Sequence, residues 1–213
     1  MNSIQEYLKR TESAVKKIYE AIDSYDIPLH SVEKPTFVYW GEETDEVEQR
    51  FQTWERENQE AIALSLKSEK DFITEIFAMA TLSGTILQFA HKAIEVFSEN
   101  KSTHPLFKDI IAQNSRYAKF CIGREIDNIP LGLIVYAGRN QAQHYNDEKY
   151  GAITTSVFDL LANYYSPTFE KHFVNDYFDL SNPNLTIYAT NIIWHLGWQR
   201  YEQYQQDLLY MLL

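Results

Sequence analysis

Glycine and proline are scarce in this chain, and this scarcity limits its fold more than any other feature. Only 7 glycines and 6 prolines interrupt 213 residues. Because sheets need frequent turns, which are rich in these two residues, the chain favours long helices over many short strands. Hydrophobic residues make up 45% of the sequence, enough to bury a sizeable core in one ordinary domain.

Apolar residues recur at helical spacing along most of the chain, which predicts an all-α fold. We expect a multi-helix up-and-down bundle that forms a single domain over residues 1–213, with residues 1–68 as an N-terminal helical extension of a bundle formed by 69–213. Residues 69–97 carry apolar side chains on nearly every side, which is typical of a central, buried helix. The predicted helices span residues 3–25, 45–66, 69–97, 105–117, 130–146, about 157–161 and 184–212.

The N-terminal residues and the cysteine content predict a cytoplasmic protein. The single cysteine, Cys121, excludes an internal disulfide and suits a reducing compartment. The first residues have neither the basic start nor the apolar core of a signal peptide. No uninterrupted apolar run is long enough to span a bilayer, so no association with a membrane is expected.

Several enzyme classes lack their sequence signals here. The six histidines show no Glu-x-x-His or His-Glu-x-x-His spacing, so neither a metal site nor another cofactor is expected. The glycines form no phosphate-binding loop, and no Gly-x-Ser-x-Gly elbow is present. A net charge of -11 argues against a broad basic surface and leaves room only for a small local cluster. His91 and His195 stand among apolar residues, and we expect both to hydrogen-bond in or near the core.

One segment, Gly138–His144, is unusual for its place, because polar side chains interrupt a strongly apolar helix. On an ideal helix Asn140 and His144 share one face, whereas Arg139 lies about 140° from His144 around the axis. The long arginine side chain can still approach the imidazole, particularly if Gly138 loosens the turn. Otherwise the two groups must converge across a dimer axis.

This Arg-polar-x3-His arrangement resembles the active motif of HEPN-domain ribonucleases, a helical family that includes many prokaryotic toxins and phage-defence nucleases. The family pattern is an arginine, usually followed by a polar residue, with a histidine four to six positions after the arginine. Arg139, Asn140 and His144 match it residue by residue. The resemblance is firm over this one helix. Beyond it only the helical content of residues 69–213 matches, and the first two helices exceed a minimal domain of the family.

The resemblance implies metal-independent cleavage of RNA. Neutral His144 would take the proton of a ribose 2′-hydroxyl, Arg139 would hold the scissile phosphate bidentately, and Asn140 would orient the phosphate or the imidazole. Attack by the 2′-oxygen would leave a cyclic phosphate, so DNA would be inert. In this family the site usually lies between two protomers, which implies a homodimer, and a nucleotidyltransferase-like protein antitoxin is a common partner. Arg124 is a candidate extra phosphate contact, although solvation or a pair with Asp127 explains it more simply.

The alternative function is a non-catalytic helical module that dimerises or binds a partner. The acidic net charge and the tyrosine-rich C-terminal helix fit this alternative at least as well. In that case the polar turn around Asn140 would hydrogen-bond two helices or two chains. The two functions differ in what they predict for the substitution His144→Ala, which would abolish activity only in the nuclease.

Overall fold

The computed structural model describes residues 3–26, 35–38, 45–166, 171–182 and 185–213. Contacts divide the chain into two compact units, one of residues 1–22 with 79–213 and one of residues 23–78. The described residues are mostly helical, so the predicted helical class is confirmed. The sequence grouped the first helix with an extension of residues 1–68, whereas in the structure residues up to Ile22 belong with the larger unit.

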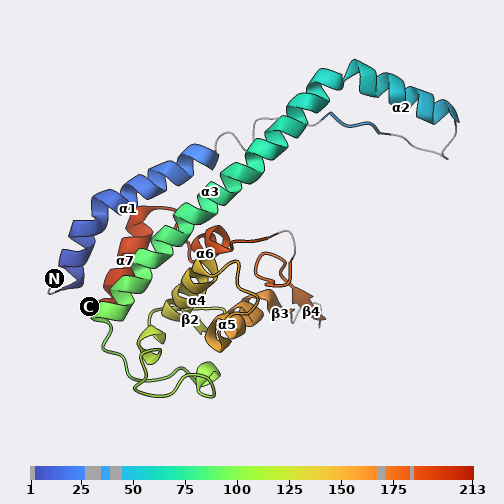
Figure 1. Cartoon of the computed structure of the whole chain (residues 1–213). Coiled ribbons are helices and arrows are strands. Elements are labelled where there is room, and N and C mark those ends of the chain that lie inside the picture. Colours follow the sequence, from blue (N-terminus) through green and yellow to red (C-terminus); the bar gives the residue numbers. More distant parts are fainter. Residues whose placement is uncertain (1–2, 27–34, 39–44, 167–170, 183–184) are drawn as a thin grey trace. The chain divides into compact units, whose positions relative to one another are not determined.

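The larger unit is built around helix α4 (Leu131–Gln143), which packs against α5 (Ala152–Ala162) and α6 (Ala189–His195) (Figure 1). The N-terminal half of α4 is wholly apolar and its side chains are removed from solvent, among them Leu133, Ile134, Val135 and Ala137. Burial of this kind stabilises a helix far more than intrinsic propensity does. The burial of this half therefore fixes the position of the polar C-terminal half of α4.

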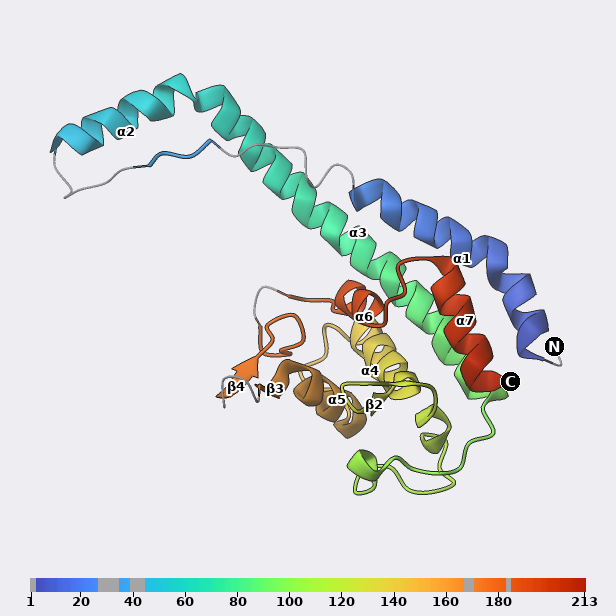
Figure 2. The ribbon, with the colours of Figure 1, turned by 180° about the vertical axis from the view of Figure 1, so that it is seen from behind.

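Helices α1 (Ile4–Asp26) and α7 (Tyr201–Leu212) lie beside the C-terminal part of α3 (Gln59–Phe97) in both views (Figures 1 and 2). The Tyr7 hydroxyl donates a hydrogen bond to the Phe89 carbonyl at 2.8 Å, which ties α1 to α3. The Lys16 ammonium lies 5.0 Å from the centre of the Tyr201 ring, which ties α1 to α7.

The expectation of a fully buried third helix is wrong for its N-terminal part. Ile86, Leu87 and Ile94 are completely buried in the larger unit, but Ile73 is 65% exposed and Ile76 is 41% exposed. A helix of 39 residues is about 58 Å long, which is more than one core of this size can cover. Its start is also earlier than predicted, since α2 (Asp45–Glu57) ends just before Gln59.

The stretch Ile73–Phe97 is long and apolar enough to cross a membrane, with a mean hydropathy of 1.3 over its most apolar window. Length and composition are the only grounds for this, and the core helix of a protein without a membrane meets the same criterion. The buried positions from Ile86 to Ile94 pack inside the larger unit, as a core helix does.

The helix predicted over residues 105–117 is absent from the structure. Two 3-10 turns, η2 (Pro105–Phe107) and η3 (Ala118–Phe120), flank an irregular segment instead. Asn114 has a positive φ of 59°, which interrupts a right-handed helix. The Asn100 side chain also donates to the Ala118 carbonyl at 2.6 Å. Polar side chains that bond to the backbone in this way compete with helix formation.

A short hairpin precedes α4, where the sequence predicted only a helix start. Strand β1 (Glu125–Ile126) pairs with β2 (Ile129–Pro130), and the two turn residues Asp127 and Asn128 have φ of 52° and 63°. Two successive positive φ values define the tight turn that suits the twist of a hairpin, and Asp and Asn tolerate them. Helix α4 then begins at Leu131, one residue after the predicted proline.

The C-terminal third departs from its predicted pattern in two places. A hairpin of β3 (Asn163–Ser166) and β4 (Lys171–Val174) follows α5 and was not expected. The predicted last helix is two helices, α6 and α7, because Gly197 has a φ of 70° and turns the chain between them. Only glycine adopts this left-handed conformation without a steric cost.

Candidate active site

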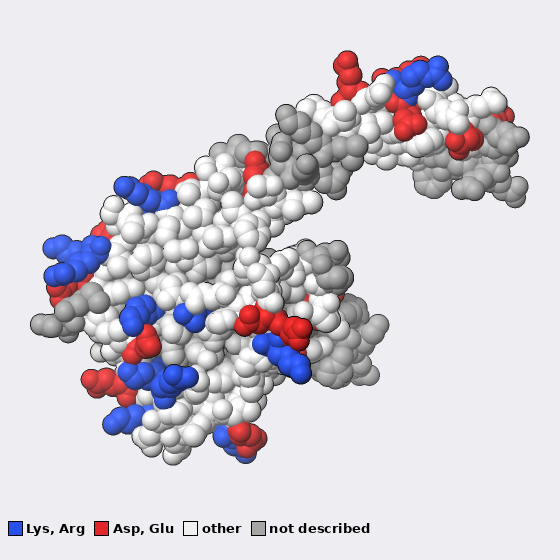
Figure 3. Space-filling model, viewed as in Figure 1, with Lys and Arg blue, Asp and Glu red and all other residues white. Residues whose placement is uncertain are grey.

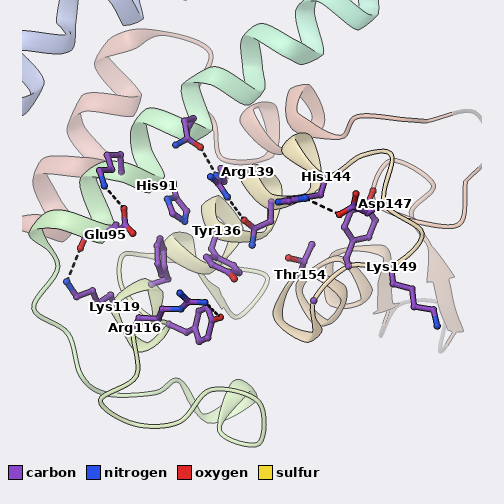
Figure 4. A pocket seen from close by; sticks show the side chains of 17 residues that line it. His91, Glu95, Arg116, Lys119, Tyr136, Arg139, His144, Asp147, Lys149 and Thr154 are labelled. Carbon is purple, nitrogen blue, oxygen red and sulfur yellow. Dashed lines mark hydrogen bonds and ion pairs between the residues drawn. The ribbon is translucent and has the colours of Figure 1, made fainter.

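An open cleft of about 890 Å³ lies in the larger unit, and the three motif residues Arg139, Asn140 and His144 all line it. Its walls come from the C-terminal part of α3, the segment around η3, the polar half of α4, the loop that follows α4, and the start of α5 (Figure 4). The structure therefore brings the predicted catalytic residues to one solvent-accessible space within a single chain.

Two polar stripes on otherwise apolar helices form the facing walls of the cleft. On α3 the stripe is Gln88, His91, Lys92 and Glu95, spaced so that all four side chains share one face. On α4 the corresponding stripe includes Tyr136, Arg139 and Asn140. Beside both stripes lie fully buried residues, among them Leu87 and Ile94 on α3 and Val135 and Ala137 on α4, so packing in the core fixes the direction of both stripes.

Arg139 is held by hydrogen bonds from both stripes. Its Nε donates to Gln88 Oε1 at 2.6 Å, and its Nη1 donates to Asn140 Oδ1 at 2.8 Å. Gln88 is itself fixed, because Gln143 Nε2 donates to the same oxygen at 2.7 Å. In the described part of the chain no partner binds Nη2 of Arg139. A guanidinium with a fixed plane and a nitrogen left for a ligand is suited to an anionic group.

Asn140 supports the guanidinium instead of the imidazole. Besides accepting the bond from Arg139, its side chain is hydrogen-bonded to the Tyr136 hydroxyl. Burial nevertheless raises the pKa of Tyr136 above its ordinary value, while this bond acts in the opposite direction. Tyr136 is therefore a neutral hydroxyl in the cleft at neutral pH.

His144 lies where α4 ends, so the angle of about 140° that separates Arg139 from His144 on an ideal helix does not apply to it. The helix ends at Gln143, three residues before the predicted Asn146, and His144 is its C-cap with φ -118° and ψ 27°. A side chain at a non-helical residue does not follow the 100° repeat. Arg139 and His144 consequently reach the same cleft without a loosened turn at Gly138.

Asp147 orients the imidazole of His144, and sequence reasoning missed it. His144 Nδ1 lies 3.0 Å from Asp147 Oδ2, and the Asp147 amide donates to the His144 carbonyl at 2.9 Å. A carboxylate beside Nδ1 favours the tautomer that carries its proton there, which leaves Nε2 as the acceptor. The imidazole is 54% exposed, so Nε2 is accessible to a ligand.

The cleft is rich in positive charge, although the chain as a whole carries -11. Among its lining residues five are lysine or arginine and two are carboxylates: Lys92, Arg116, Lys119, Arg139 and Lys149 against Glu95 and Asp147. Figure 3 shows basic side chains gathered on this face, over the C-terminal part of α3 and the coil that follows it. A concave surface with an excess of one sign concentrates ligands of the opposite sign.

His91 is not the core histidine that the sequence predicted. It lines the cleft, with its ring 4.7 Å from that of Phe120 and 5.8 Å from that of Tyr136. His195 lies outside the cleft, where its Nε2 is 2.9 Å from an Asp127 carboxylate oxygen. His195 is partly buried, which agrees better than the position of His91 with the prediction that both histidines lie in or near the core.

Arg124 is not brought to the cleft. Its guanidinium donates to both carboxylate oxygens of Asp207 at 3.0 Å and to the Leu196 carbonyl at 2.6 Å. Asp207 also accepts from the indole nitrogen of the buried Trp198 at 2.7 Å. These bonds join the β1–β2 hairpin to the α6–α7 turn, so Arg124 has a structural role, with Asp207 and not Asp127 as its partner.

No family model, curated protein or solved structure matches the chain. The function is therefore inferred from the site itself. In the part of the chain that the structure describes, no three His, Cys, Asp or Glu side chains are grouped so that they could hold a metal ion. The donor set of the cleft is instead one of imidazoles, guanidinium and ammonium groups, which suits an anionic substrate.

Proposed function

We propose that this protein is a metal-independent endoribonuclease of the HEPN type, acting as a toxin or phage-defence effector. One observation carries the proposal: Arg139 and His144 line a single cation-rich cleft, each held by a neighbouring side chain. These are the two groups that the resemblance to HEPN ribonucleases requires, and their supports, Gln88 and Asp147, lie outside the motif.

The proposed reaction is attack of a ribose 2′-oxygen on the adjacent phosphorus. Nε2 of His144 takes the 2′-hydroxyl proton as the bond from the 2′-oxygen to phosphorus forms. Arg139 binds the non-bridging oxygens, on which negative charge grows in the transition state. The bond from phosphorus to the 5′-oxygen breaks as that oxygen receives a proton, and the products are a 2′,3′-cyclic phosphate and a 5′-hydroxyl.

The charge distribution fits a short contact with RNA and not a long one. Five basic side chains line the cleft, while the net charge of -11 repels polyanions elsewhere. The substrate is therefore expected to be held at a few phosphates around Arg139. The homodimer, the protein antitoxin, the HEPN-like bundle of residues 69–213 and the cytoplasmic location that the sequence predicted belong to this proposal.

Cleavage of RNA in excess chelator tests the proposal. We expect the purified protein to cut RNA in EDTA, and His144→Ala to lower the rate on the order of 10²-fold, the usual contribution of a positioned general base. The matched control is His195→Ala, because this histidine lies outside the cleft, and it should cut at the wild-type rate. The proposal is wrong if cleavage requires an added metal ion or survives His144→Ala.

A partner-binding role is the second candidate, and exposed apolar side chains favour it. Ile73 and Ile76, one turn apart on the same face of α3, are 65% and 41% exposed, and adjacent exposed apolar side chains are typical of a surface that binds a partner. If partner binding were the whole function, the cleft variants would change neither RNA cleavage nor RNA binding. The chelator experiment therefore separates the two candidates.

A further inference from the structure

The cleft contains a second imidazole that the HEPN-like motif does not include. His91 comes from α3 and not from the motif helix, and in the view of Figure 4 Arg139 lies between it and His144. The two histidines therefore come from different elements and line the same cleft as Arg139, and the charge of Arg139 acts on the His91 ring.

The surroundings of His91 hold its ring but leave its nitrogens unused. Phe120 and Tyr136 pack around the ring with centroid distances of 4.7 and 5.8 Å. Among the residues that the structure describes, none donates to or accepts from either ring nitrogen. A half-buried imidazole in a fixed plane, open to the cleft and without a partner, is placed for contact with a ligand.

Strand cleavage by a 2′-oxygen needs two proton transfers, and His144 accounts for only one. The 5′-oxygen is a poor leaving group unless it receives a proton as its bond to phosphorus breaks. We propose that His91 is the general acid that supplies this proton, so that one chain contains base, phosphate ligand and acid. This inference rests on the proposed function and names a further catalytic residue for it.

The complete step balances within these groups. The proton of the 2′-hydroxyl passes to His144 Nε2, the bond between the 2′-oxygen and phosphorus forms, and the bond to the 5′-oxygen breaks. The imidazolium of His91 gives its proton to the departing 5′-oxygen and becomes neutral. Exchange of one proton with water at each imidazole restores the starting state, and no oxidant or co-reactant takes part.

Substrate binding favours the protonated form that this role requires. In the free protein, burial lowers the pKa of His91 to about 4, with the charges of Arg139 and Lys92 acting in the same direction and that of Glu95 against them. A phosphate bound to Arg139 brings negative charge beside the ring and offsets the guanidinium. Tyr136, whose ring lies 5.8 Å from that of His91, stays neutral because burial raises its pKa. Proton uptake by His91 is thus coupled to binding of an anion.

A substrate with a sulfur atom in place of the 5′-bridging oxygen tests the role of His91. A thiolate leaves without prior protonation because thiols are far stronger acids than alcohols, with a pKa of about 8.5. We expect His91→Gln to slow cleavage of the oxygen substrate on the order of 10²-fold, and that of the sulfur substrate by less than about fivefold. His144→Gln should slow both substrates, since the 2′-proton must be removed in either case.

A second variant and a control keep the result independent of folding. His91→Phe preserves ring packing against Phe120 and should give the same selective loss, whereas His195→Gln should leave both rates unchanged. Equal losses on the two substrates would show that His91 has only a structural role. An unchanged rate on the oxygen substrate would show that His91 takes no part in cleavage. If the wild-type protein cuts neither the oxygen nor the sulfur substrate, the proposed function itself is wrong. If His144 is essential and His91 is not, only this inference fails.

Discussion

Replacing Arg139 by alanine should lower kcat for RNA cleavage on the order of 10³-fold, the larger end of what one lost group that stabilises transition-state charge costs. The guanidinium is the best-anchored cation of the cleft, with hydrogen bonds of 2.6 Å to Gln88 and 2.8 Å to Asn140. A group fixed in advance does not reorganise as the charge develops, and this makes its contribution large. Single-turnover rates at saturating RNA measure the effect.

Arg139→Lys is the matched control for charge alone. Lysine keeps the positive charge but lacks the planar fork that binds two oxygens together, so we expect it to recover no more than about tenfold of the lost rate. Thermal melting of both variants checks that the cleft remains folded. A rate for Arg139→Ala within tenfold of wild type would remove Arg139 from the chemistry.

Replacing Gln141 by leucine should destabilise the protein by about 3 kcal/mol, although this residue belongs to the same polar turn. Gln141 is completely buried. Its Nε2 donates to the Thr186 carbonyl at 2.8 Å and to the Tyr150 hydroxyl at 3.2 Å, and its Oε1 accepts from the Tyr188 amide at 2.9 Å. Leucine would remove all three bonds and leave the buried Tyr188 amide without its partner, and an unsatisfied buried group alone costs about 1–3 kcal/mol.

The same substitution two residues later provides the control. Gln143 is exposed and bonds only to Gln88 among the described residues, so Gln143→Leu should change stability by no more than about 0.5 kcal/mol. In a chain of this length, 3 kcal/mol lowers Tm by roughly 6–12 °C. Equal melting temperatures for the two variants would contradict the structural role of Gln141.

This division of one polar turn shows what the motif could and could not reveal. Four polar residues interrupting an apolar helix indicate that something other than core packing is required there. Their separate roles depend on what other segments place beside them: Gln141 meets the segment before α6, and Arg139 meets α3. No local pattern contains that information, because these contacts join residues about 45 and 51 positions apart.

Other parts of the site have a recognisable pattern in the sequence. Gln88, His91, Lys92 and Glu95 recur at the spacing of one helix face within a strongly apolar stretch. A polar stripe on a helix that is otherwise buried predicts a lined cavity or an interface, and would have separated His91 from an ordinary core histidine. Asp147, three residues after His144, needed knowledge of where α4 ends.

Long periodic segments were predicted well and short irregular ones were not. The apolar pattern of α1 and of α4 continues over several turns, so many residues agree on one structure. The β1–β2 hairpin depends on two residues with positive φ, and the break between α6 and α7 depends on Gly197, which has a positive φ, and on Arg200, which is extended. Such single positions are decided by tertiary packing as much as by local preference.

Cleavage of a DNA strand that contains one ribonucleotide, in excess EDTA, is the sharpest test of the proposed reaction. This reaction predicts a cut only on the 3′ side of that ribonucleotide, with a 2′,3′-cyclic phosphate on one product and a 5′-hydroxyl on the other, while the all-DNA strand stays intact. An uncut ribonucleotide strand, cleavage of the all-DNA strand, or a product with a 5′-phosphate would contradict it.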